Sequence, residues 1–336
     1  MTATHLPTRN QQKPTRIVWP AVLGIVLIGG ATFYFLFWRL RPVGAGPAGP
    51  PLAGDSFGEV WSDRKVLLVG MGGTITAGQG ASSKHRGYFR RLISSPPDEL
   101  PEIRGKCLSA VLPNLRAHAL AVAVSPTLEC AHELVPMLEV QDEDTFGIIV
   151  LTIGLDDFSP PGEAAPREGA MYGAAFETAQ AWIDDFRSLL EEVLDGLEER
   201  FPGGCEFFIA NVFDPSDGGS DVSIAGLPVW PARRRILAEY NEIIVRAAKS
   251  RRNARLIDLH AAFLGHGVCC RQFWRPIYDR DDPHCWYSET LDAANDRGHD
   301  AIRRLFLNEM IATLSPLLRG DAASRTAKKY TAGVPY

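Results

Sequence analysis

The residues best suited to chemistry in this chain stand in one glycine-rich turn, with Thr74 at its centre. An apolar run, 65–69, leads into the turn. The glycines around Thr74 are Gly70, Gly72, Gly73 and Gly78. Glycines allow tight turning and close backbone approach, as a nucleophile turn or an anion-binding turn requires. An ordinary glycine-rich connection between a strand and a helix has the same composition, so the turn alone leaves both interpretations open.

The element that must position Thr74 is a strand. The apolar, β-branched residues before the turn predict a buried parallel strand, and open α/β sheets bind ligands at the carboxyl ends of such strands. Further apolar runs alternate with helical patterns, which is typical of a parallel sheet covered on both faces. The later strands are expected at 119–124, 147–152, 205–211 and 255–259. We therefore expect an α/β fold of three layers, α/β/α, with a five-stranded parallel, flavodoxin-like sheet.

Three helices and one long loop complete the expected domain. Apolar residues at spacings of three and four predict a helix over 172–200. A second helix is expected to begin near Pro231, and a last one to cover about 300–314. The loop 212–230 is rich in Asp, Gly, Ser and Pro and follows the fourth strand. It should therefore lie on the same edge of the sheet as Thr74.

The N-terminal region predicts a membrane anchor. Residues 17–38 are 22 positions without a charge, enough to cross a hydrocarbon core of ~30 Å. Their aromatic end resembles an interfacial belt, and the run is longer than the apolar part of a cleaved signal peptide. Basic residues are slightly more numerous before this run than after it. We therefore expect a cytoplasmic tail, 1–16, and a single-pass protein whose main domain is periplasmic or extracellular.

The rest of the chain divides by composition. Residues 39–56 are mostly Pro, Gly and Ala and predict a semi-flexible linker. The α/β domain is expected over 57–318, with a flexible polar tail over 319–336. A net charge of −5 and the absence of long basic runs argue against nucleic acid as a partner. The six cysteines could pair in an exported domain, in fifteen ways, and the sequence does not choose among them.

The order of motifs resembles the SGNH (GDSL-type) esterases and acyl hydrolases, and the likeness covers most of 65–310. A strand is followed by Gly-x-x-Ile-Thr-x-Gly at 72–78, and a second strand is expected near Ala119. The segments Leu151–Asp157 and Asn295–Ile302 complete the set. The resemblance implies a hydrolase fold without a cofactor or metal. It also implies acyl esters or acylated carbohydrates as ligands.

The family's catalytic positions are changed in this chain. The resemblance places Gly73 and Thr74 on the family's Asp and nucleophilic Ser. Val124 falls on a glycine whose N–H helps to bind the oxyanion, and Asp156 falls on an asparagine whose amide donates to it. The His-Pro-Asn of the last motif becomes Ala293, Ala294 and Asn295, so the family's general base is absent.

These changes predict weak or absent esterase activity. An ionised Asp156 accepts hydrogen bonds and donates none, and the loss of one oxyanion donor costs about 2.7–4 kcal/mol. A hydroxyl without a neighbouring base is a weak nucleophile. His299 is the first candidate for a substitute base, followed by the loop residues His260, His266 and His284.

Three other interpretations compete with a family-type esterase. A non-catalytic binding or scaffold domain could keep the same fold, since fold does not imply function. Residues 72–75 also resemble the opening turn of L-asparaginases, which use a threonine nucleophile. A zinc site from the His and Cys residues of 260–285 is disfavoured, because the cysteines there are adjacent or isolated rather than spaced as pairs.

Overall fold

The computed structural model describes the chain except residues 1–17, 40–45, 122–126, 159–170, 220–228 and 333–336. It divides into two compact units, Met1–Arg41 and Pro42–Tyr336. The first unit contains helix α1 (Val18–Tyr34), continued by the short π-helix η1 (Phe35–Arg39). Within the described residues, Trp19–Phe37 is the one helical segment long and apolar enough to cross a membrane, by length and composition alone.

The second unit is built on a parallel sheet, as expected. The sheet has five strands in the order β2-β1-β3-β4-β5, and every neighbouring pair is parallel. The strands are β1 (Lys65–Gly72), β2 (Leu115–Ala121), β3 (Thr145–Thr152), β4 (Cys205–Ala210) and β5 (Ala254–Ile257). The central strand β1 forms its ladder with β2 on one side and β3 on the other. The α/β fold class is thereby confirmed.

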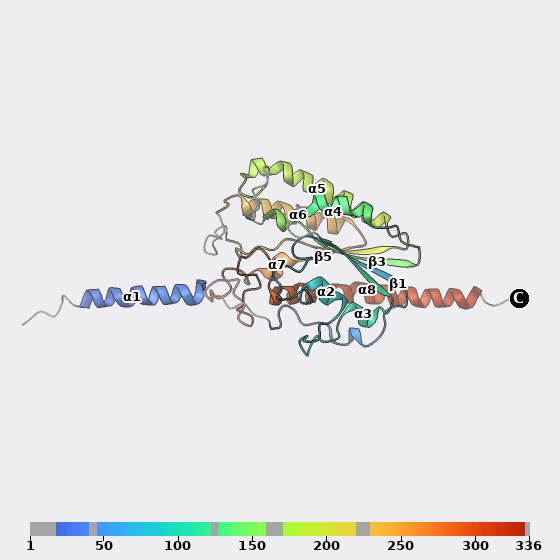
Figure 1. The fold of residues 1–336 in the computed structure, drawn as a ribbon, viewed down its shortest axis with the longest axis horizontal. Coiled ribbons are helices and arrows are strands. Elements are labelled where there is room, and N and C mark those ends of the chain that lie inside the picture. The colour runs from blue at the N-terminus through green and yellow to red at the C-terminus, as the bar shows by residue number, and fades with distance from the viewer. Residues whose placement is uncertain (1–17, 40–45, 122–126, 159–170, 220–228, 333–336) are drawn as a thin grey trace, which may run out of the picture. The chain divides into compact units, whose positions relative to one another are not determined.

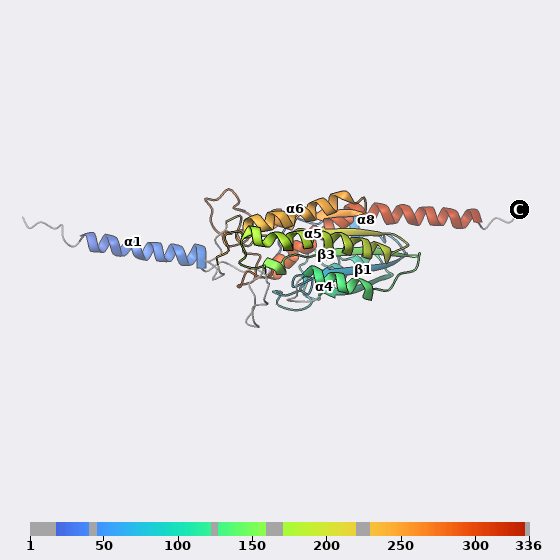
Figure 2. The ribbon, with the colours of Figure 1, turned by 90° about the horizontal axis from the view of Figure 1, so that it is seen from above.

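Helices cover both faces of this sheet, which gives the three layers (Figures 1 and 2). One face carries α4 (Thr127–Leu134), α5 (Phe176–Glu199) and α6 (Arg233–Ser250). The opposite face carries α2 (Tyr88–Ile93), α3 (Leu108–Val111), α7 (Leu259–Phe263) and α8 (Asp296–Ala332). Along β1 the side chains alternate between the faces. Val66 and Leu68 pack in the core on the α8 face, and Leu67 and Val69 pack in the core on the α5 face. Burial on both faces explains the continuous apolar run.

Two elements differ from the sequence expectation. Strand β2 begins at Leu115, four residues before the expected 119–124, and residues 122–124 lie outside the described part. Its residues Arg116–Ala119 are exposed, so no buried run marks where this edge strand begins. Helix α8 begins at Asp296 rather than near 300 and continues to Ala332, through most of the segment expected to be a flexible tail.

The segment expected to be a linker lies against α8 from Gly46 onward. The Ala48 N–H donates to Asp300 Oδ2 at 3.3 Å, and Ala48 is buried. The Ala53 N–H donates to Asn308 Oδ1 at 3.3 Å, and Asn308 Nδ2 donates to the Pro51 carbonyl at 3.1 Å. We call residues 46–53 the α8 strap. Side chains of the helix satisfy backbone groups of this Pro- and Gly-rich segment, which its composition did not indicate.

Candidate functional site

Thr74 lies where the strand order of the sheet changes direction. Strand β1 ends at Gly72, which is paired with Ala121 of β2 and with Thr152 of β3. The chain leaves β1 toward β2 on one side, while β3, β4 and β5 follow in order on the other. Loops after β1 and β3 therefore diverge, and open α/β sheets bind ligands at such a switch point. This position makes the Thr74 turn the candidate active site.

The loop after β3 brings Asp156 into contact with Thr74. The Thr74 N–H donates to Asp156 Oδ2 at 3.1 Å, and the Thr74 side chain also lowers the pKa of this carboxyl group. Gly154, at a φ of 89°, supplies the turn between β3 and the short 3-10 helix η4 (Asp156–Phe158). The expected meeting of Thr74 and Asp156 at one edge of the sheet is thus observed.

The environment of this pair disfavours the ionised form of the Asp156 carboxyl group. Burial raises the pKa of Asp156 above its ordinary value, and the nearby Asp292 adds to the rise. Hydrogen bonding from Thr74 acts in the opposite direction but is outweighed. The influence of Asp292 on Asp156 makes the site unfavourable for additional negative charge.

Gly73 is a glycine because Asp156 fills the space beside it. A Cβ at Gly73 would lie 1.8 Å from Asp156 Oδ2, closer than real Cβ contacts occur. The aspartate that the resemblance expects at this position would therefore displace the Asp156 side chain. Gly73 and Asp156 form a matched pair, and restoring the family residue at 73 alone is sterically blocked.

The position of the missing base is filled by apolar packing. Ala293 is buried, and a Cβ added to Gly80 would lie 2.9 Å from the Ala293 Cβ. Gly80 closes the Thr74 turn, in which the Gln79 N–H donates to the Thr74 carbonyl at 3.0 Å. The last motif therefore packs against the candidate site without supplying a titratable group at 293.

Asn295 has a structural role at the start of α8. Its side-chain oxygen accepts from the N–H groups of Arg297 at 2.9 Å and Gly298 at 3.0 Å. Its amide donates to the carbonyls of Cys285 and Tyr287, both at 2.8 Å. Asn295 is an N-cap that satisfies orphan donors of the helix, and this cap explains why α8 begins earlier than expected.

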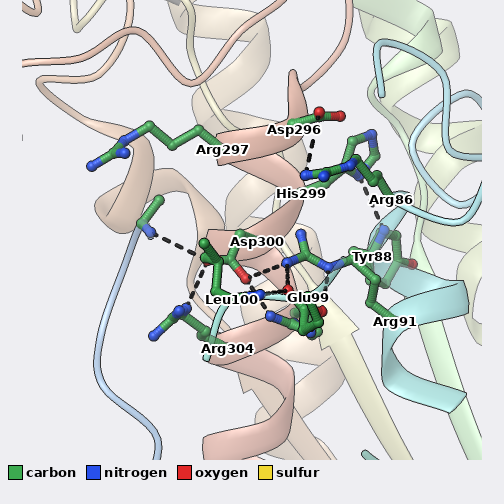
Figure 3. A network of polar contacts seen from close by, with 12 residues as sticks. Arg86, Tyr88, Arg91, Glu99, Leu100, Asp296, Arg297, His299, Asp300 and Arg304 are labelled. Carbon is green, nitrogen blue, oxygen red and sulfur yellow. Dashed lines mark hydrogen bonds and ion pairs between the residues drawn. The ribbon is translucent and has the colours of Figure 1, made fainter. Parts of the chain in front are cut away.

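His299 does not have a ring nitrogen available to act as a base. Its Nδ1 accepts from the Tyr88 N–H at 3.3 Å (Figure 3). Its Nε2 lies 2.9 Å from the Gln79 carbonyl, to which it must donate. The side chain is fully buried, and burial lowers the pKa of His299 to about 4. His299 is thus a neutral histidine that joins the Thr74 turn to α8 and α2, and the geometry does not support the expected role as substitute base.

The other candidate histidines have partners of their own, and His260 lies on α7 rather than in a loop as expected. His260 Nδ1 lies 3.1 Å from the Val212 carbonyl, and His284 Nδ1 lies 2.8 Å from Asp282 Oδ1. His266 stacks on Trp286 with ring centroids 3.6 Å apart. No cluster of three or more His, Cys, Asp or Glu side chains suited to a metal ion occurs among the residues that the structure describes.

Val124 and part of the loop 212–230 lie outside the residues that the structure describes. The N–H of Val124 therefore cannot be placed. The loop 212–230 is described up to Gly219 and again from Val229. Its described start is rigid: Asp217 Oδ1 accepts from the N–H groups of Gly265 and Gly267, both at 2.9 Å. Buried polar contacts of this kind hold the loop against the segment that follows α7.

A hydroxyl cluster under the Thr74 turn was not expected from the sequence. Thr76 Oγ1 lies 3.0 Å from the Tyr88 hydroxyl, which lies 3.2 Å from Thr152 Oγ1. All three side chains are buried, and burial raises the pKa of Tyr88 to about 12. These neutral hydroxyls link the end of β3, the turn and α2. The Ile-Thr of the turn motif is the part of the signal that could have indicated it.

A buried ionic network continues from this cluster along α8 (Figure 3). Glu99 binds Arg91 through Oε1 at 2.6 Å and also pairs with Arg303. Asp300 binds Arg91 at 3.0 Å and Arg304 at 2.9 Å. The network joins α2, the loop before α3 and α8 behind His299. The network holds these elements together behind the site, and these contacts do not involve the Thr74 hydroxyl.

The described cysteines are thiols. Cys107, Cys205, Cys269, Cys270 and Cys285 are buried. Burial raises the pKa of the Cys205 thiol to about 12, which keeps it protonated. The fold is therefore complete without a disulfide among these five residues.

Comparison with known proteins gives distant structural matches. No family model matches the chain, and no curated protein matches it. An α/β hydrolase from the metagenome of Lake Arreo is similar at 14% identity and a TM-score of 0.45, over 75% of this chain and 97% of that one. A lipolytic G-D-S-L family protein from Veillonella parvula matches at 11% identity and a TM-score of 0.42, over 72% of this chain and 96% of that one.

An acetyl xylan esterase from Geobacillus stearothermophilus matches at 16% identity and a TM-score of 0.43, over 75% of this chain and 96% of that one. The solved structures that resemble this chain thus include one described as a lipolytic G-D-S-L protein and one described as an acetyl xylan esterase. At these identities and TM-scores the matches leave the activity of the chain open.

Proposed function

We propose that this chain is a membrane-anchored binding domain on an SGNH-type hydrolase fold, with little or no esterase activity of the family type. The observation that carries the proposal is the contact between Thr74 and Asp156. Asp156 Oδ2 accepts a hydrogen bond from the Thr74 N–H at 3.1 Å. Acyl esters and acylated carbohydrates are the ligands that the family resemblance implies.

The contact opposes ester hydrolysis through charge. An ester carbonyl that is attacked by Thr74 becomes an oxyanion, which needs donors such as the N–H of the nucleophile itself. Here that N–H is already bound to Asp156. If the carboxyl group is ionised it repels the oxyanion, and if it is protonated it has one proton to donate but cannot act as a base. The ionised state therefore lacks a donor for the oxyanion, and the protonated state lacks a base for the Thr74 hydroxyl.

The membrane anchor is the second part of the proposal. Its support is the apolar helix Trp19–Phe37 and the arginines that flank the uncharged run. The slight excess of positive charge before the helix favours a cytoplasmic N-terminus and an exported domain. A protease added to intact cells should remove the domain, whereas complete protection would refute this orientation.

A threonine hydrolase that uses Asp156 as its base is the alternative. It is favoured by one observation, the contact of Thr74 with a carboxyl group whose pKa is raised by burial. Such a carboxylate could accept the hydroxyl proton as Thr74 attacks. The donor for the oxyanion would then have to come from residues other than Thr74.

Hydrolysis of a p-nitrophenyl acyl ester by the full chain in detergent micelles separates the two functions. The variants are Thr74→Ala and Asp156→Asn, with Thr178→Ala on the exposed face of α5 as a matched control. The binding domain should show the same background rate in all four proteins. Turnover above background that both site variants abolish and the control retains would establish the threonine hydrolase instead.

A further inference from the structure

The loop between α7 and α8, residues 264–295, carries two exposed aromatic rings, and we call it the aromatic loop. Phe273 is 63% exposed and the adjacent Trp274 is 46% exposed. The rings contact each other edge to face, with centroids 5.1 Å apart. Among the described residues of Pro42–Tyr336, these are the aromatic side chains that the fold leaves exposed to solvent. Two adjacent exposed aromatic rings are costly in water and indicate a contact surface.

Buried residues next to the aromatic pair hold the two rings in their exposed position. Cys270 and Gln272 are fully buried, and Arg275 Nε donates to Gln272 Oε1 at 2.7 Å. The Cys269 N–H donates to Asp217 Oδ2 at 2.6 Å. These contacts hold the backbone on both sides of the aromatic pair, so the rings are presented by the fold.

Positive charge flanks the aromatic pair. Arg271 precedes the pair and Arg275 follows it. Of the acidic residues in the loop, Asp282 is bound to Arg297, with Oδ1 2.7 Å from Nη2. An aromatic pair between two arginines combines an apolar tip with groups that bind phosphate.

The aromatic loop and the entry point of the chain lie at one end of the domain. Gly46 is the first described residue after the apolar helix, and a Cβ there would lie 3.0 Å from Arg297 Nη1. Arg297 in turn binds Asp282 of the aromatic loop. The brown and orange loops before α8 lie at the start of that helix in both ribbon views (Figures 1 and 2).

We propose that Phe273 and Trp274 insert into the interfacial region of the phospholipid bilayer that the anchor crosses. Aromatic rings with an apolar body are enriched at this depth of a membrane, and arginines beside them bind lipid phosphates. The domain is then held to the bilayer by a second contact besides the anchor. This contact keeps the edge of the sheet that carries Thr74 in a fixed position relative to the membrane. The proposal rests on the membrane anchor proposed above and is independent of whether Thr74 is catalytic.

Quenching of tryptophan fluorescence by brominated lipid tests the contact. The full chain is reconstituted in phosphatidylcholine and phosphatidylglycerol vesicles, with and without brominated acyl chains. The variants are Trp274→Phe and, as a matched control, Trp182→Phe on α5. Trp19 and Trp38 flank the apolar run, so three of the seven tryptophans should be quenched in the wild type. Trp274→Phe should therefore lower the bromine-sensitive emission by roughly a third, and Trp182→Phe should leave it unchanged.

Each other outcome has a distinct meaning. Equal bromine-sensitive emission in wild type and Trp274→Phe refutes the contact. Absence of any quenching refutes the anchor itself, which separates that failure from failure of the contact. Trp274 emission that ignores brominated lipid but shifts with a soluble oligosaccharide would make the pair a sugar-binding surface and refute the lipid proposal. Arg271→Gln with Arg275→Gln should reduce the Trp274 quenching that depends on phosphatidylglycerol.

Discussion

The substitution Gly73→Ala tests the pairing of Gly73 with Asp156. The new Cβ would stand 1.8 Å from Asp156 Oδ2, so the carboxylate must move away. Its movement breaks the hydrogen bond from the N–H of Thr74, a residue that is 6% exposed. Gly73 does not have a left-handed φ, so backbone strain is not part of the effect.

The expected loss follows from the contact that is broken. A hydrogen bond to a charged acceptor contributes about 1.5–3 kcal/mol, so Gly73→Ala should lower the free energy of unfolding by about 3 kcal/mol. Asp156→Ala loses the same bond and removes the obstacle. The double variant should therefore be close to Asp156→Ala alone, with a coupling energy of about 2–3 kcal/mol.

Urea unfolding of the full chain in micelles, followed by circular dichroism, gives these free energies. The control is Gly320→Ala in α8, where the added Cβ has no atom within 4 Å; it should stabilise by about 0.5–1 kcal/mol. If Gly73→Ala destabilises as much in the Asp156→Ala background as in the wild type, the two residues are not paired as described.

Three further predictions concern the support of the site. Because burial lowers the pKa of His299 to about 4, the unfolded chain binds more protons than the folded chain between that pH and about 6.5. His299→Gln should therefore lose less stability than wild type on acidification through this window, by roughly 3 kcal/mol, in denaturant unfolding at several pH values. Glu99→Gln removes one of the two buried carboxylates that Arg91 and Arg303 share with Asp300 and should cost about 3–5 kcal/mol, whereas Lys65→Gln at an exposed ion pair should change little. Gly49→Val should release the α8 strap and expose it to limited proteolysis, because a Cβ there lies 3.0 Å from the Ala301 Cα; Gly105→Val, with a similar φ of 77° but open space around it, should not.

The sheet and its long helices could be predicted from the sequence because their patterns are local. A strand buried on both faces is a continuous apolar run, and α5 repeats its apolar residues at three and four. The start of β2 was missed because its side chains are mostly exposed. The start of α8 was missed because it depends on the Asn295 cap, and the sequence does not show which N–H groups the Asn295 side chain binds.

The site was predictable only in part, for a similar reason. Parallel strands put their carboxyl ends on one edge, so the meeting of Thr74 and Asp156 follows from topology. The role of His299 does not, because its two ring nitrogens are bound by Tyr88 and Gln79, which lie 211 and 220 residues away in the chain. The α8 strap depends likewise on Asp300 and Asn308, over 250 residues from the groups they bind.

The central claim is that Asp156 occupies the N–H of Thr74 and leaves the Thr74 hydroxyl without nucleophilic function. Its most direct test is intact-mass spectrometry of the full chain after treatment with a fluorophosphonate, which forms a covalent adduct with the activated hydroxyl of serine and threonine hydrolases. A serine esterase treated in parallel shows that the reagent is active. We predict that the mass of this chain does not change. An adduct of one phosphonyl group that peptide mapping assigns to Thr74, and that Thr74→Ala eliminates, would contradict the account.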